Sequence, residues 1–216
     1  MNERKLSFFD TIINELDQSL RTVHTLAPTT ERPYPAKGIS EKQLLNEREK
    51  KKSASLMRIN HAGEVSAQGL YRGQALTAKR DDIRQQMERS AMEENDHLNW
   101  CERRLDDLDA PKSLFGPLWY WGSFTIGAAA GLVGDKWSLG FVKETEDQVV
   151  RHLDEHLERI SEKDEPSKAI LQQMRIDEAH HADVAVDAGA SRLPLPIRKV
   201  VMPLMSKVMT TVSGKI

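Results

Sequence analysis

The chain has 216 residues, 30% of them charged and 6% aromatic, which favours one largely helical domain, alone or with an appendage. Its 31 basic and 33 acidic residues give a formal net charge of −2, so no global charge bias points to nucleic acid as a partner. The single cysteine, Cys101, excludes an internal disulfide framework and a cysteine metal cluster, and it fits a reducing compartment.

Residues 1–52 are predicted to form an amphipathic helix followed by a linker. No long apolar run precedes Asp10, so we expect no secretory signal. The helix is indicated by apolar residues at helical spacing, namely Phe8, Ile12, Ile13, Leu16 and Leu20. Residues 26–52 begin with three prolines and end in charge, which indicates a linker that becomes helical near Ser40.

Residues 53–189 are predicted to form a helical bundle. Apolar residues recur in steps of three and four, which is typical of helices with one core-facing stripe. Two pairs of such helices make an all-α four-helix bundle. The expected helices run from about Ser53 to Arg80, Asp82 to Leu108, Ser138 to Lys163 and Pro166 to Gly189.

Between the two pairs lies an uncharged stretch of 22 residues, 113–134. It contains Pro117, five glycines and the aromatic cluster 119–121. It is long enough to cross a bilayer as a helix, but its glycines weaken a helix and its aromatics favour the membrane interface. Three interpretations stay open: a membrane span, a segment lying in the interface, and a buried helix pair in a soluble core.

The last segment, residues 190–216, is apolar and basic and contains no acidic residue. It is predicted to form a C-terminal helix that either lies on an anionic membrane or docks on the bundle.

Two short sequences place a glutamate three residues before a histidine, so that both side chains share one face of a helix. They are "EENDH", with Glu94 and His97, and "DEAHH", with Glu178 and His181. Both pairs interrupt an apolar stripe, and a buried carboxylate is costly unless it is paired or bound to a metal.

Each pair also follows a helix with a single glutamate on its core stripe. Glu64 lies 30 residues before Glu94, and Glu146 lies 32 residues before Glu178. The repeated unit would gather four carboxylates and two imidazoles around one point, which is the ligand set of ferritin-like di-iron or di-manganese centres. Imidazole suits iron, and four carboxylates balance two divalent ions. The alternative, four unrelated helical acids in surface ion pairs, leaves the interrupted stripes unexplained.

Two further residues are candidates for catalysis. His152 lies two turns from Glu146 on nearly the same side of its helix, where it can line a pocket or assist proton transfer. Tyr71 lies two turns from Glu64 on the same face, where it can relay an electron or a proton, although a tyrosine in such a place is more often part of the core.

Four stretches resemble the demethoxyubiquinone hydroxylase family of ubiquinone biosynthesis: "RINHAGEVSAQGLYRGQ", "EENDH", "KETEDQVVRHLDEHL" and "DEAHHADVAVDAGA". The likeness covers about residues 53–216 and leaves the segment before residue 53 outside. It implies a ferritin-like fold, and it matches His152 to a family histidine near the centre. In eukaryotic members that histidine is followed by a tyrosine implicated in electron transfer, whereas here Leu153 follows. It also implies that two iron ions are held by Glu64, Glu94, His97, Glu146, Glu178 and His181.

The resemblance further implies an O₂-dependent monooxygenase that hydroxylates the ring of a polyprenylated demethoxyubiquinol at a membrane surface. The lack of a mitochondrial-type presequence favours a bacterial member, hence the cytoplasmic face of the inner membrane. NADH or another reductant is expected, although no G-x-G-x-x-G fingerprint is present. The alternatives are another ferritin-like function (quinol oxidase, ferroxidase or peroxide scavenger) and a metal-free membrane scaffold. Binding of other ubiquinone-biosynthesis proteins, or of a second copy of the chain, stays open.

Overall fold

The computed structural model describes residues 7–30 and 32–215, and within these ranges every regular element is a helix. The all-α prediction is therefore confirmed for the part of the chain that is described. In chain order the elements are α1 (Phe8–His24), α2 (Glu47–Thr77), α3 (Asp81–Asp107), α4 (Gly116–Val133), α5 (Asp135–Arg159), α6 (Glu165–Asp187), the π-helical turn η1 (Ile197–Val201) and α7 (Met202–Ser213).

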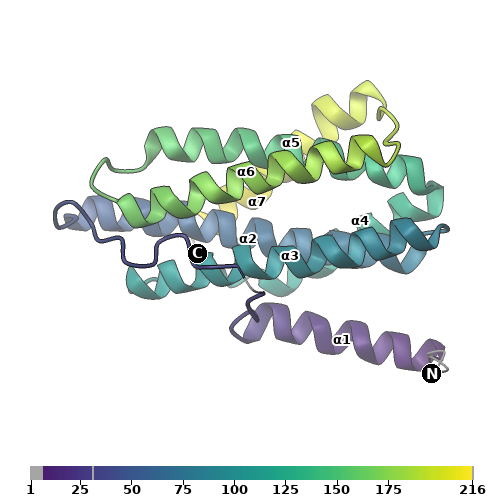
Figure 1. The fold of residues 1–216 in the computed structure, drawn as a ribbon, viewed down its shortest axis with the longest axis horizontal. Helices are drawn as coiled ribbons and strands as arrows, with labels where there is room; N and C mark the ends of the chain where they lie inside the picture. The colour runs from purple at the N-terminus through teal and green to yellow at the C-terminus, as the bar shows by residue number, and fades with distance from the viewer. Residues whose placement is uncertain (1–6, 31, 216) are drawn as a thin grey trace.

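Helices α2, α3, α5 and α6 form the four-helix bundle, built as two helical hairpins that lie side by side (Figure 1). They are the four helices expected from the apolar stripes. The first begins at Glu47, so the expectation that the linker becomes helical near Ser40 is wrong. The start is fixed by a capping box, in which Asn46 Oδ1 accepts from the Glu49 amide at 2.9 Å and Glu49 Oε2 accepts from the Asn46 amide at 2.9 Å.

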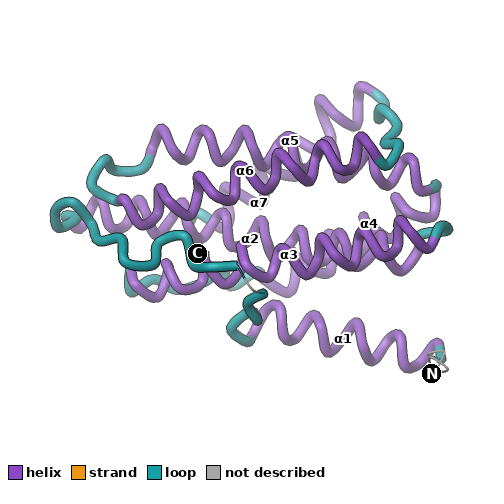
Figure 2. The backbone as a smooth tube through the Cα atoms, in the orientation of Figure 1, coloured by secondary structure: helices purple, strands orange, loops and turns teal. Residues whose placement is uncertain are grey.

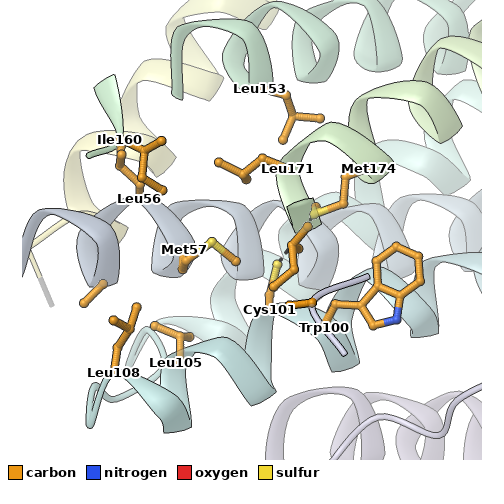
Figure 3. Close-up of a cluster of buried hydrophobic side chains, with 13 residues drawn as sticks. Leu56, Met57, Trp100, Cys101, Leu105, Leu108, Leu153, Ile160, Leu171 and Met174 are labelled. Carbon is orange, nitrogen blue, oxygen red and sulfur yellow. Dashed lines mark hydrogen bonds between the residues drawn. The ribbon is translucent and has the colours of Figure 1, made fainter. Parts of the chain in front are cut away.

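The core of the bundle consists of two apolar layers with a polar layer between them. One apolar layer gathers around Tyr71, Ile83, Met87 and Leu139. The other, drawn in Figure 3, includes Leu56, Met57, Trp100, Cys101, Leu105, Leu153, Leu171 and Met174. On each bundle helix, the predicted glutamate and histidine ligands come after the residues of one apolar layer and before those of the other. The apolar layers thus remove the polar layer from water.

The uncharged stretch forms a single helix, α4, which packs along α2 outside the four-helix bundle. The two backbones touch at glycines: a Cβ added at Gly69 would lie 2.2 Å from the Tyr120 carbonyl oxygen, and one at Gly73 would lie 2.1 Å from that of Phe124. Among the helices of the described residues, none combines the length and the apolar character needed to cross a bilayer. Because the stretch forms one helix, the interpretation as a helix pair is wrong.

The two ends of the chain add helices to the outside of the bundle. Arg72 of α2 holds α1 through two contacts of 2.7 Å with the Glu15 carboxylate. The apolar face predicted for this helix is exposed at Ile13, Leu16 and Leu20. At the other end α7 packs on α2, where Ser55 Oγ donates to the Gly214 carbonyl at 2.8 Å, as one of the two interpretations of the C-terminal segment expected.

The glycine contacts between α2 and α4 predict that Gly73→Ala destabilises the fold by about 1–3 kcal/mol, the usual cost of overpacking. The matched control is Gly122→Ala on α4, where an added Cβ meets nothing within 4 Å. That variant is expected to be neutral or to gain about 0.5–1 kcal/mol from helix propensity. Urea unfolding measures both, and equal effects of the two substitutions would contradict the close approach of the backbones.

Candidate metal centre

The polar layer holds all six predicted ligands, and each of them is at most 7% exposed. The helices α2 and α5 each contribute one glutamate. The helices α3 and α6 each contribute a glutamate and a histidine one turn later, which therefore point to the same side. The six residues are Glu64 (α2), Glu94 and His97 (α3), Glu146 (α5), and Glu178 and His181 (α6).

Glu94 and Glu178 lie between the two imidazoles. His97 Nδ1 is 2.9 Å from Glu94 Oε2 and 3.1 Å from Glu178 Oε1. His181 Nδ1 is 3.1 Å from Glu94 Oε1 and 3.3 Å from Glu178 Oε2. Each carboxylate thus turns one oxygen towards each imidazole, an arrangement in which it can bridge two cations.

The two remaining glutamates close the layer from the α2–α5 side. Glu64 Oε2 is 3.7 Å from His97 Nδ1. Ligand atoms of Glu64, Glu94, His97 and Glu178 all lie within 4.8 Å of one another, and this group can hold a metal ion. Glu146 lies close enough to Glu178 and Glu94 for their charges to raise its pKa. Oxygen and imidazole donors of this kind fit iron or another first-row divalent metal.

Burial and mutual charge shift the pKa values of these groups strongly. Burial, reinforced by Glu94 and Glu178, raises the pKa of Glu64 and Glu146 well above the usual range. Burial alone would lower the pKa of His97, but the negative charge of Glu94 and the surrounding hydrogen bonds outweigh it and raise that pKa. Protons on these groups therefore balance the buried negative charge, and cations that bind here must displace them.

A second shell of acids orients the imidazoles. Asp177 Oδ2 lies 2.9 Å from His97 Nε2, and Glu93 Oε2 lies 3.0 Å from His181 Nε2. Asp177 directly precedes Glu178, and Glu93 directly precedes Glu94. Each acid therefore supports the histidine of the other Glu-x-x-His pair. The sequence analysis did not single them out, although the acidic pairs that open "EENDH" and "DEAHH" carried the signal. Such partners fix which nitrogen of a ligand histidine faces the metal.

The two candidate catalytic residues occupy different places. Tyr71 is fully buried, and its hydroxyl donates to Glu146 Oε1 at 2.6 Å, in direct contact with the polar layer. His152 instead lines a cavity of about 510 Å³ beside the layer. Its Nε2 is 3.5 Å from Ser206 Oγ, and burial lowers its pKa.

The cavity is bounded by α2, α4, α5 and α7. Its lining includes Gly63 and Thr145, the chain neighbours of Glu64 and Glu146. The rest of its lining is mostly apolar, and α7 contributes residues that the sequence analysis did not connect with the site. The lining includes Leu70, Leu118, Ile126, Phe141, Val149, Leu204, Met205 and Val208.

The bundle and its polar layer together define a ferritin-like protein whose centre can bind metal. A sequence model of the family described as "Ubiquinone biosynthesis protein COQ7" matches residues 51–213, and the chain belongs to this family.

Curated relatives extend the match to nearly the whole chain. The chain is 57% identical over 210 residues to a 3-demethoxyubiquinol 3-hydroxylase of Nitrosococcus oceani, which covers 97% of each chain. Proteins of the same name from Nitrosomonas europaea (52% over 202 residues, 93% of this chain and 95% of the relative) and Pseudomonas fluorescens strain Pf-5 (52% over 208 residues, 96% of each) are also similar. The family model begins at residue 51, close to the expected start of the family likeness at residue 53, whereas the match to these relatives also includes most of residues 1–52.

The pKa shifts predict how stability depends on pH. Above pH 6.5 unfolded histidines lose their protons, whereas folded His97 and His181 keep theirs. Metal-free protein should therefore lose stability as pH rises, by up to about 1.4 kcal/mol per pH unit for each such group. A bound metal replaces these protons, so its stabilisation should grow with pH. Thermal unfolding with and without divalent metal tests this, and a metal-induced shift that stays constant with pH would contradict it.

Proposed function

We propose that this chain is a 3-demethoxyubiquinol 3-hydroxylase, an O₂-dependent monooxygenase that hydroxylates the ring of a polyprenylated quinol in ubiquinone biosynthesis. The near-full-length similarity to bacterial proteins of that name supports the reaction. The observation that carries the mechanism is the buried layer of four glutamates and two histidines next to an apolar cavity. No side chain can reduce O₂ by itself, and this donor set is suited to a metal that can.

In this proposal the six residues would hold two iron ions, and Glu94 and Glu178 each face both imidazoles. Bound iron supplies the redox chemistry by which one oxygen atom of O₂ enters the ring and the other leaves as water, with two electrons from a reductant such as NADH. The protein orients the donors and keeps water out. The apolar layers on both sides of the centre serve the second task.

The cavity is the proposed site of the quinol. Its apolar lining suits a prenyl tail, and a ring bound near Gly63 and Thr145 would lie against the chain neighbours of Glu64 and Glu146. Four large apolar cavity residues are themselves exposed, Leu118, Leu204, Met205 and Val208, so the cavity opens onto an apolar surface of α4 and α7. A substrate that stays in a bilayer can enter from such a surface.

Two residues are proposed to handle protons during the reaction. Tyr71 holds its proton on Oη beside Glu146 and can donate it within the centre. His152 lines both the apolar cavity and a polar hollow of about 250 Å³, whose lining includes Arg151 and Lys207. Because burial lowers its pKa, its imidazole is neutral near pH 7 and can accept a proton from a ring hydroxyl.

We also propose that the protein sits peripherally on the cytoplasmic face of the bacterial inner membrane. The exposed apolar residues at the cavity mouth support this, together with the basic residues Arg198, Lys199 and Lys207 near the same C-terminal helix. Of the rival ferritin-like functions, ferroxidase and peroxide scavenging need no cavity sized for a prenylated ring, whereas a quinol oxidase needs one as much as a hydroxylase does. The products distinguish them, because only the hydroxylase adds oxygen to the quinol.

Substitution Glu178→Ala removes one of the two carboxylates that face both imidazoles, so iron binding and hydroxylation should fail together. The loss should exceed about 100-fold, the upper end of what losing an outer hydrogen-bond partner costs. The matched control is Asp183→Ala, which removes an exposed acid from the same helix. Iron content and the quinone profile of complemented cells report the outcome. A Glu178→Ala protein with full iron and full hydroxylation would rule out this centre.

Substitution Ala67→Phe fills the cavity from α2, one turn after Glu64. It should raise KM for a long-tailed quinol by at least about tenfold, which corresponds to about 1.4 kcal/mol, while iron content stays unchanged. A tail-less quinol should be affected less. Ala129→Phe, at an exposed position of α4, is the matched control. If the two variants share the wild-type KM for both substrates, the quinol binds elsewhere.

A further inference from the structure

The connection between α1 and α2 lies against the polar layer from outside. We call residues 26–30 and 32–34 the strap. Figure 2 draws this connection as a loop, and Figure 1 shows it passing across the bundle near α3 and α6, the helices that carry the two Glu-x-x-His pairs. The strap precedes residues 51–213, the part of the chain that matches the COQ7 family model.

Buried polar groups of α3 fasten the strap. The Thr30 amide donates to Asp96 Oδ1 at 2.8 Å, and its hydroxyl donates to the other oxygen of the same carboxylate. The Ala27 amide donates to Glu102 Oε2 at 2.9 Å, while the Ala27 carbonyl accepts from Asn99 Nδ2 at 2.8 Å. These α3 side chains are at most 3% exposed. Buried polar groups need such partners, so this side of α3 is built to receive the strap.

Within the anchored strap, Arg32 contacts Asp177, the acid that supports the proposed ligand His97. Its guanidinium forms an ion pair with Asp177 Oδ2, the oxygen that lies 2.9 Å from His97 Nε2. The same guanidinium lies 5.0 Å from the centroid of the Trp100 ring, and that ring is 5.3 Å from the His97 ring. Arg32 therefore contacts two of the groups that surround the His97 imidazole.

A comparison with His181 shows what Arg32 adds beside His97. Glu93, the partner of His181, is paired with Arg89 one turn earlier on its own helix, at 2.9 Å. The corresponding neighbour of Asp177 is Gln173, which donates a neutral hydrogen bond at 3.0 Å. The helix α6 thus lacks a cation at this position, and Arg32 supplies it from the strap.

We propose that Arg32 is a positioning residue of the metal centre. It holds Asp177 against His97 Nε2 and thereby keeps His97 Nδ1 directed at Glu94 and Glu178. The inference rests on the proposed metal function of these residues, and it extends the centre to a segment that precedes the family's matched region.

The test loads the full chain with Fe²⁺ without oxygen and follows release of iron to a colorimetric chelator. Arg32→Ala should release the ion held by His97 about 10–100 times faster than wild type, the range typical for loss of an outer partner. Arg32→Lys should restore part of the difference, because it keeps the charge but loses the planar fork. The matched control is Arg103→Ala, since Arg103 holds the same segment only through the Tyr34 ring, at 4.0 Å, and it should stay within about twofold.

A double-mutant cycle shows whether Arg32 acts through Asp177. In an Asp177→Asn background, Arg32→Ala should add little to the release rate, and the melting temperature of the metal-free protein should not track that rate. If Arg32→Ala and wild type release iron at the same rate, or if Arg103→Ala releases it as fast as Arg32→Ala, the role of Arg32 is overturned. The proposed metal centre is not affected by either result. A wild-type chain that binds no iron would overturn the proposed centre together with the inference.

Discussion

The burial of four carboxylates and two imidazoles in the middle of a helical bundle is the constraint on which the remaining structure depends. The apolar layers at both ends of the centre stabilise the fold, but they also deprive Glu64, Glu94, Glu146 and Glu178 of water. Isolated buried charges cost several kcal/mol each, so positive charge must be present among them. Protons can meet this requirement, as the raised pKa values of Glu64 and His97 indicate, but two divalent cations meet it more completely.

The donor side chains of such a centre must be fixed in orientation as well as brought close together. The helices set the position of each ligand, yet an imidazole can still rotate about its side-chain bonds, and only a partner on its second nitrogen stops that rotation. Both histidines have such an acid. Glu93, the acid beside His181, is paired with Arg89 of its own helix α3. Asp177, the acid beside His97, is paired with Arg32 from a loop. Rigid elements and an anchored loop therefore share the task of fixing the geometry.

The sequence predicted that these six residues meet because the information is local: a helical period, an interrupted apolar stripe and a Glu-x-x-His spacing are all visible within one helix. The four bundle helices followed from the same periodicity. What the sequence did not reveal depends on distant pairs. Asp177 is 80 positions from His97, and Arg32 is 145 positions from Asp177. The place of α4 likewise depends on Gly69 and Gly73 of another helix, a match that no single stretch displays.

The two sides of the centre serve different purposes. On the α3–α6 side lie both histidines, their supporting acids and the strap, all joined by hydrogen bonds and ion pairs. On the α2–α5 side lie Glu64, Glu146 and Tyr71, next to the cavity that α4 and α7 cover. In the proposed function, a quinol in that cavity would approach the glutamates from the side opposite the acids that support the histidines. Separating the two sides lets the cavity adapt to a large apolar substrate without disturbing the contacts that hold the imidazoles, because those contacts come from other helices.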